Sequence, residues 1–106
     1  MKKIPLLYTD VKGTGPTVVL LHGFLASSRY WEKVTDLVSQ NYKVITFDLL
    51  GFGASPKPRK NSYDYADHID SINATLEQLD IRGDFILMGH SMGSLIALRY
   101  ATLYNE

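Results

Sequence analysis

Three short apolar runs constrain the fold of this 106-residue chain more than any other feature. They occupy residues 17–22, 43–48 and 84–89, they are rich in β-branched and aliphatic residues, and each ends in a polar residue or a glycine. A continuous apolar run, in contrast to an alternating one, is typical of a strand that is covered on both faces of a parallel sheet. We therefore expect an α/β fold built on a mostly parallel sheet with helices on both faces.

The segment before these runs and the segment after the first of them also have readable patterns. Residues 4–11 predict an edge strand, because Pro5 would remove a ladder hydrogen bond from a central one, and a turn follows at 13–16. After the first run we expect a helix that Ser27 or Ser28 caps and Asn41 ends. Its predicted buried stripe is Trp31, Val34, Leu37 and Val38.

Two further helices complete the predicted alternation of strands and helices. The second follows a Gly/Pro-rich loop, with Asp64 as its N-cap, Asp67 in its first turn and Gly83 at its C-terminal end. Its apolar stripe is Ile69, Ile72, Leu76 and Leu79. The third follows residues 89–93 directly, with Leu95, Ile96, Leu98 and Ala101 on its buried side. The loops after all three parallel strands should meet at one edge of the sheet, where such folds bind ligands.

Composition narrows the functional classes. Eleven basic residues balance eleven acidic ones, so the chain has neither the field that attracts nucleic acid nor a polybasic membrane anchor. No cysteine is present, no apolar run is long enough to span a bilayer, and Pro5 interrupts the N-terminal apolar stretch too early for a secretory signal. We expect a cytoplasmic location and, since no ligands cluster at metal spacing, neither a metal nor an organic cofactor.

The pentapeptide GHSMG at 89–93 is the strongest chemical signal. A serine on a tight turn between a strand and a helix is held with its hydroxyl exposed, and the sharp bend requires small residues two positions before and after it. Ser91 is therefore the candidate nucleophile, and the N-terminus of the following helix would favour developing negative charge. The alternative is a glycine-bounded turn whose serine has no role.

A second signal lies at the end of the first apolar run. If the two strands are neighbours, the backbone N–H of Phe24 could join that of Met92 as an oxyanion hole, with Gly23 allowing the close approach. The alternative is an ordinary turn with a hydrogen-bonded His22. Asp48 ends the next run, and we expect it to accept backbone hydrogen bonds from its loop in preference to any catalytic or metal-binding role.

Together these motifs resemble the α/β-hydrolase superfamily, over nearly the whole chain. HGF at 22–24 looks like the family's oxyanion-loop motif, DLLGFGAS at 48–55 like its D-x-x-G-x-G-x-S loop, and GHSMG at 89–93 like its nucleophile elbow, in the family's order. The resemblance implies an α/β-hydrolase fold that is truncated after the nucleophile-elbow helix, with residues 1–106 as the N-terminal part of a single domain. It also implies that Ser91 attacks a substrate carbonyl, that Phe24 and Met92 stabilise the oxyanion, and that water cleaves the acyl-enzyme.

The rest of the family's triad, an acid and then a histidine, does not follow Ser91 in this sequence. We expect His22 to be structural, His90 to be turned away by the bend and His68 to lie near solvent, so none of the three suits the general base. The chain alone should be nearly inactive, and the unpaired edge of strand 84–89 should favour self-association.

Several functions fit these expectations. The leading one is a serine hydrolase acting on a small-molecule carboxylic ester or related carbonyl compound. A C–C bond hydrolase and a cofactor-free perhydrolase are close variants. A non-catalytic binding module and one half of a split enzyme are the alternatives of a different class. Because the elbow holds a serine, the subfamilies with an aspartate nucleophile, dehalogenases and epoxide hydrolases, fit less well.

Overall fold

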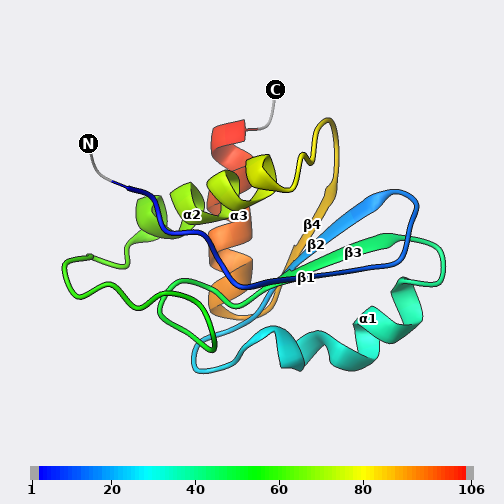
Figure 1. Cartoon of the computed structure of the whole chain (residues 1–106), viewed down its shortest axis with the longest axis horizontal. Coiled ribbons are helices and arrows are strands. Elements are labelled where there is room, and N and C mark those ends of the chain that lie inside the picture. Colours follow the sequence, from blue (N-terminus) through cyan, green and yellow to red (C-terminus); the bar gives the residue numbers. More distant parts are fainter. Residues whose placement is uncertain (1–2, 105–106) are drawn as a thin grey trace.

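A four-stranded sheet is the centre of the computed structural model, which describes residues 3–104 (Figure 1). In chain order its strands are β1 (Thr9–Lys12), β2 (Thr17–Leu21), β3 (Lys43–Phe47) and β4 (Ile86–Gly89). Their order in the sheet is β1-β3-β2-β4, with β2 parallel to both of its neighbours and β1 antiparallel to β3. The three apolar runs are the three parallel strands, which confirms the predicted α/β fold.

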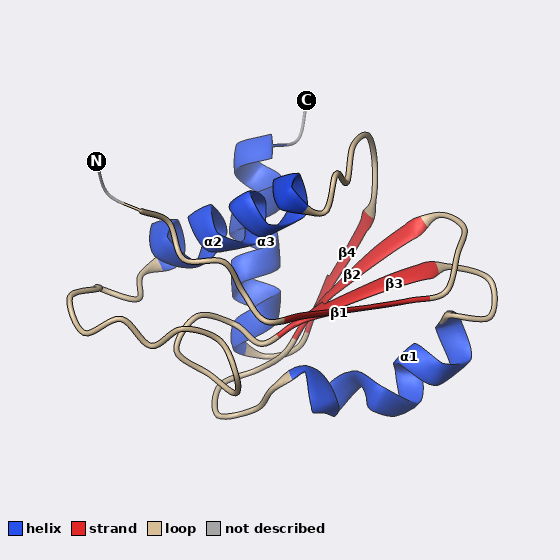
Figure 2. Cartoon of the chain, viewed as in Figure 1, coloured by secondary structure: helices blue, strands red, loops and turns tan. Residues whose placement is uncertain are grey.

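Helices cover both faces of this sheet. A 3₁₀ turn, η1 (Ser28–Trp31), leads into α1 (Glu32–Val38) on one face, and α2 (Tyr65–Gln78) and α3 (Met92–Tyr104) lie together on the other (Figure 2). Alternate residues of β2 therefore enter different cores. Val19 and Leu21 pack in the cluster with α2 and α3, whereas Val18 and Leu20 pack in the cluster with Trp31. This two-sided burial is the reason why the run reads as continuously apolar.

The side of α1 that faces the sheet differs from the prediction. Trp31 is buried as expected, but Leu37 is 69% exposed, and Thr35 is buried in its place. At 3.6 residues per turn, Thr35 lies close to Trp31 on the helix surface, whereas Leu37 lies about 120° away. Ser27 caps η1 as predicted, since its Oγ accepts the N–H of Arg29 at 3.3 Å.

The start of α2 was predicted correctly and its end was not. The Asp64 carboxylate accepts the Asp67 N–H at 2.9 Å, which is the expected N-cap. The helix ends at Gln78, and the left-handed residue that follows is Asp80, with φ 58°. Gly83, predicted at the helix end, lies three residues further along the connecting loop and has φ 77°.

The buried side of α3 was largely wrong. Ile96 is buried as expected, but Leu95 and Leu98 are exposed, and the residues that accompany Ile96 against the sheet are Gly93 and Tyr100. Residues 93, 96 and 100 lie along one face of a helix. Because α3 is apolar on most sides, its sequence alone did not show which side meets the sheet.

The predicted N-terminal strand is shorter than expected. Only β1 pairs with the sheet, where it is an edge strand as predicted. The preceding residues run across α2 instead (Figure 1), where the Leu7 N–H donates to Thr75 Oγ1 at 3.0 Å. This crossing brings Leu7 against α2, where both Leu7 and Thr75 are buried.

Candidate functional site

The carboxyl ends of β2 and β4 bring the two predicted site segments together. Leu21 is the register partner of Gly89, and the His90 N–H donates to the Leu21 carbonyl at 3.0 Å. The residues that follow each strand, 22–25 and 90–92, therefore begin side by side. This adjacency depends on the strand order, which the sequence could only assume.

The elbow itself is a sharply packed bend. A Cβ at Gly89 would overlap the Gly93 carbonyl, and a Cβ at Gly93 would overlap the carbonyl oxygens of Leu21 and His22. Ser91 between the two glycines has φ 55°, in the left-handed region that non-glycine residues rarely adopt, and its side chain is exposed. The strained backbone and the flanking glycines are the features that hold a serine hydroxyl at the start of a helix.

The loop after β2 lies against this bend. A Cβ built at Gly23 would be 3.2 Å from Ser91 Cβ, so a larger residue would press on the serine. The Ala26 N–H donates to the Gly23 carbonyl at 3.2 Å and closes a tight turn over 23–26. Within residues 3–104, neither the Phe24 N–H nor the Met92 N–H donates a hydrogen bond to another protein group. Both donors of the expected oxyanion hole are thus available to a ligand.

The buried His22 ring connects the loop at 22–25 with the start of the loop after β3. Its Nε2 accepts the Leu49 N–H at 2.8 Å, so this nitrogen carries no proton and Nδ1–H donates to the Gly23 carbonyl at 2.7 Å. Burial lowers the pKa of His22, although the Gly23 carbonyl and Asp48 oppose the shift. With both ring nitrogens occupied, His22 has the structural role that the sequence predicted.

Asp48 joins the two loops at this edge of the sheet. Its carboxylate accepts the Ser28 N–H at 2.7 Å and the Ala54 N–H at 2.8 Å. Burial opposes its ionisation, but the hydrogen bonds from Ala54 and Ser28, together with the nearby His22, outweigh burial and lower the pKa of Asp48. A Cβ at Gly53 would overlap the carboxylate, which explains that glycine. The predicted role of Asp48 as an acceptor of backbone hydrogen bonds is confirmed.

The other two histidines do not serve Ser91 either. The His90 ring stacks on Tyr30, with centroids 4.5 Å apart. His68 was predicted near solvent, and this was wrong: it is 5% exposed, on the buried side of α2 together with Ile69 and Ile72. Among the described residues, no histidine forms a hydrogen bond with the Ser91 hydroxyl.

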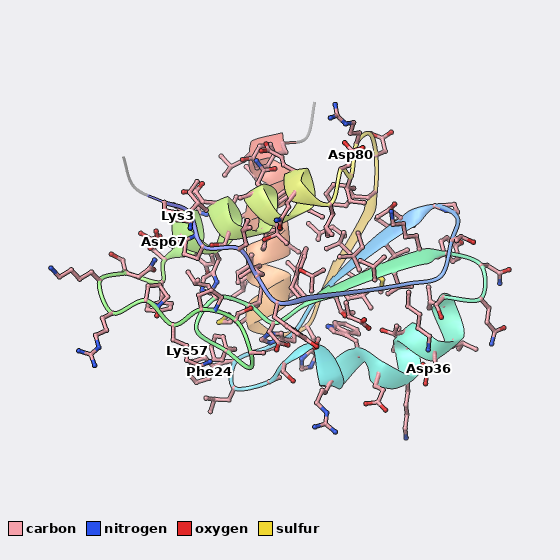
Figure 3. The ribbon with its side chains drawn as sticks, in the orientation of Figure 1. Lys3, Phe24, Asp36, Lys57, Asp67 and Asp80 are labelled. Carbon is pink, nitrogen blue, oxygen red and sulfur yellow. The ribbon has the colours of Figure 1, made fainter. Side chains whose placement is uncertain are left out.

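Aromatic side chains around the site were missed as functional candidates. Phe24 lies among the loops at this end of the sheet (Figure 3), and its ring meets Phe52 edge-on at 5.6 Å. Phe52 in turn meets the His22 ring at 5.7 Å. Phe52 stood inside a recognised loop motif without an assigned role, and nothing in the sequence connected Tyr30 with His90.

Two further properties concern the described part of the chain alone. Between residues 3 and 104, no three acidic or histidine side chains gather in a way that could hold a metal ion. No helix in this range has the length and hydropathy needed to cross a bilayer.

Comparisons with known proteins place the chain in a family. A family model described as "alpha/beta hydrolase fold" matches residues 16–106. The chain is 36% identical to a probable lysophospholipase, BODYGUARD 4, of Arabidopsis thaliana, over 92% of this chain and 24% of that protein. It is 38% identical to a putative non-heme chloroperoxidase of Synechocystis sp., over 97% of this chain and 37% of the relative. A haloalkane dehalogenase of Mesorhizobium japonicum is 36% identical, over 93% and 33%.

A solved structure agrees with these matches. An esterase from Exiguobacterium antarcticum superposes with a TM-score of 0.86 at 33% identity, over 96% of this chain and 38% of the esterase chain. This chain thus spans between about a quarter and just over a third of the length of the proteins named here. Because the family model matches most of the sequence, the chain belongs to the α/β-hydrolase-fold family.

Proposed function

We propose that this chain is the N-terminal part of a single α/β-hydrolase domain of a serine hydrolase that cleaves a carboxylic ester or related carbonyl compound through an acyl-enzyme on Ser91. The observation that carries the proposal is the position of an exposed Ser91, in a left-handed conformation, against Gly23. Two further observations support the proposal: Ser91 directly precedes the N-terminus of α3, and the N–H groups of Phe24 and Met92 donate to no other group within residues 3–104.

The proposed reaction uses these groups in order. Ser91 Oγ attacks the substrate carbonyl carbon and loses its proton to a general base. The negative charge that develops on the carbonyl oxygen is stabilised by the N–H groups of Phe24 and Met92 and by the dipole of α3. Collapse of the tetrahedral intermediate expels the alcohol, and water then hydrolyses the acyl-enzyme.

The general base and its acid are proposed to come from the part of the family's length that this chain does not span. In α/β-hydrolases the acid and the histidine follow the serine in the chain. Without the histidine, turnover in a serine triad falls by about 10⁶. We therefore expect residues 1–106 alone to hydrolyse p-nitrophenyl acetate at a negligible rate, and Ser91-dependent turnover at an ordinary esterase rate would contradict this.

Labelling of the full-length protein with a fluorophosphonate probe tests the proposal. The wild type and a Ser39→Ala control should be labelled, and Ser91→Ala should not. No labelling of a folded wild type would favour a non-catalytic binding module. Labelling that appears only when a second polypeptide is added would favour a split enzyme.

A second candidate is a cofactor-free perhydrolase, in which hydrogen peroxide in place of water attacks the acyl-enzyme and releases a peracid. The name of the Synechocystis relative, a putative non-heme chloroperoxidase, favours this variant. Peracid formation from an ester and hydrogen peroxide, lost in Ser91→Ala, would support it. Dehalogenation, the reaction named for the Mesorhizobium relative, fits this chain less well, because the dehalogenase subfamilies use an aspartate where this chain has Ser91.

A further inference from the structure

Leu25 is the residue at this site that neither packing nor turn chemistry explains. Its φ is 61° at the third position of the turn over 23–26, where glycine or asparagine is the usual residue. Its side chain is 80% exposed, so it contributes little to the core. An apolar residue that is both strained and exposed beside a candidate active site suggests a role in function.

The residue before it extends the same surface. Phe24 is 64% exposed, yet its ring is held edge-on by Phe52, which rests on the buried and doubly hydrogen-bonded His22. The Phe24 ring is therefore held by Phe52 on one side and exposed on the other. Gly23 lies against Ser91, the candidate nucleophile. The apolar surface of Phe24 and Leu25 therefore begins at the residue that follows this contact.

Two charged groups of the loop after β3, Asp48 and Lys57, are already engaged. Asp48 is 4% exposed and accepts two backbone N–H groups. Lys57 Nζ donates to the carbonyls of Gly53 and Ser55. A charged substrate group would find no free partner among these residues, whereas an alkyl or aryl group could cover Phe24 and Leu25 and gain the free energy of their burial.

We propose that Phe24 and Leu25 form an apolar wall that binds the alkyl chain on the acyl side of an uncharged ester, with Leu25 as a specificity-determining residue. The inference rests on the proposed function, since it takes Ser91 as the nucleophile. The competing occupant is a protein segment from the part of the family's length that this chain does not span. If a substrate chain covers Leu25, its loss should change the selectivity among esters. If a protein segment covers it, its loss should lower the stability of the protein.

The test compares p-nitrophenyl acetate, butyrate and octanoate as substrates of the full-length protein. Leu25→Asn keeps a residue that tolerates the left-handed conformation while removing the apolar side chain. We expect kcat/KM for octanoate to fall roughly tenfold, as expected for the loss of most of one leucine contact, while the value for acetate changes less than about twofold. The matched control is Leu37→Asn, at a leucine of α1 that is 69% exposed.

Other outcomes overturn the inference. An equal fall for all three esters together with a lower melting temperature would show that a protein segment covers Leu25. Unchanged ratios with intact fluorophosphonate labelling of Ser91 would refute the apolar wall and leave the proposed function standing. Absence of Ser91 labelling in the wild type would refute both.

Discussion

Replacement of Asp48 should loosen both loops at the candidate site. This side chain is 4% exposed, and its two oxygens accept the N–H groups of Ser28 and Ala54 at 2.7 and 2.8 Å. Asp48→Ala would leave two backbone donors without an acceptor in a partly buried place. Asp48→Asn would keep one acceptor and turn an NH₂ group towards the other donor.

The magnitudes follow from the cost of an unmade hydrogen bond. A buried donor without a partner costs about 1–3 kcal/mol, and a bond to a charged acceptor contributes about 1.5–3 kcal/mol. We therefore expect Asp48→Ala to lower the free energy of unfolding by about 4 kcal/mol and Asp48→Asn by about 2 kcal/mol. Against a typical total of about 5–15 kcal/mol, both losses are large.

The pH dependence supplies a second signature. Because the folded-state pKa of Asp48 lies below its ordinary value of 3.8, the unfolded state binds this proton more readily. The stabilisation by the carboxylate is therefore complete above about pH 3.8 and is lost as the pH falls through the folded-state value. Asp48→Asn should lack this contribution to acid unfolding.

Equilibrium urea unfolding of the full-length protein at pH 7 measures the first effect, and the same titration at low pH measures the second. Asp36→Asn is the matched control, because that carboxylate pairs with Lys12 on the surface and is 63% exposed. Exposed pairs contribute about 0–1 kcal/mol. A variant Asp48→Asn as stable as the control would refute the reasoning.

Three further outcomes follow from the same contacts. Burial lowers the pKa of His22 and His68 below 6.5, so their contribution to the free energy of unfolding should be complete above pH 6.5 and decline as the pH falls below it. Urea midpoints that do not change from about pH 7.5 to 5 would contradict this. Gly93→Ala should cost about 3 kcal/mol or more, as core overpacking does, and abolish fluorophosphonate labelling, because its Cβ would overlap strand carbonyls; a wild-type melting curve would show that this contact can relax. We also propose that isolated residues 1–106 self-associate through β4, where Ile86 and Met88 are 49% and 47% exposed; Ile86→Lys should shift light scattering towards the monomer, and a wild type that is already monomeric would count against the proposal.

The local signals in the sequence were sufficient for much of the site. The apolar runs predicted the three parallel strands. The two glycines around Ser91 predicted the tight elbow, and the structure explains them, because a Cβ atom at either position would overlap backbone atoms. Asp48 was recognised as a loop acceptor because a short carboxylate at a strand end bonds nearby backbone groups. Each of these predictions depended on residues close together in the chain.

Contacts between distant residues required the tertiary structure. Whether His68 is buried depended on how α2 packs against the rest of the fold. The stacking of Tyr30 on His90 depended on the alignment of β2 with β4. The side of α3 that meets the sheet was also undetermined, since a helix that is apolar on most sides can bury several faces. Sequence patterns determine which elements form and where they bend, because those preferences are local; which faces and loops meet is decided by packing among elements, whose free energy depends on the whole arrangement.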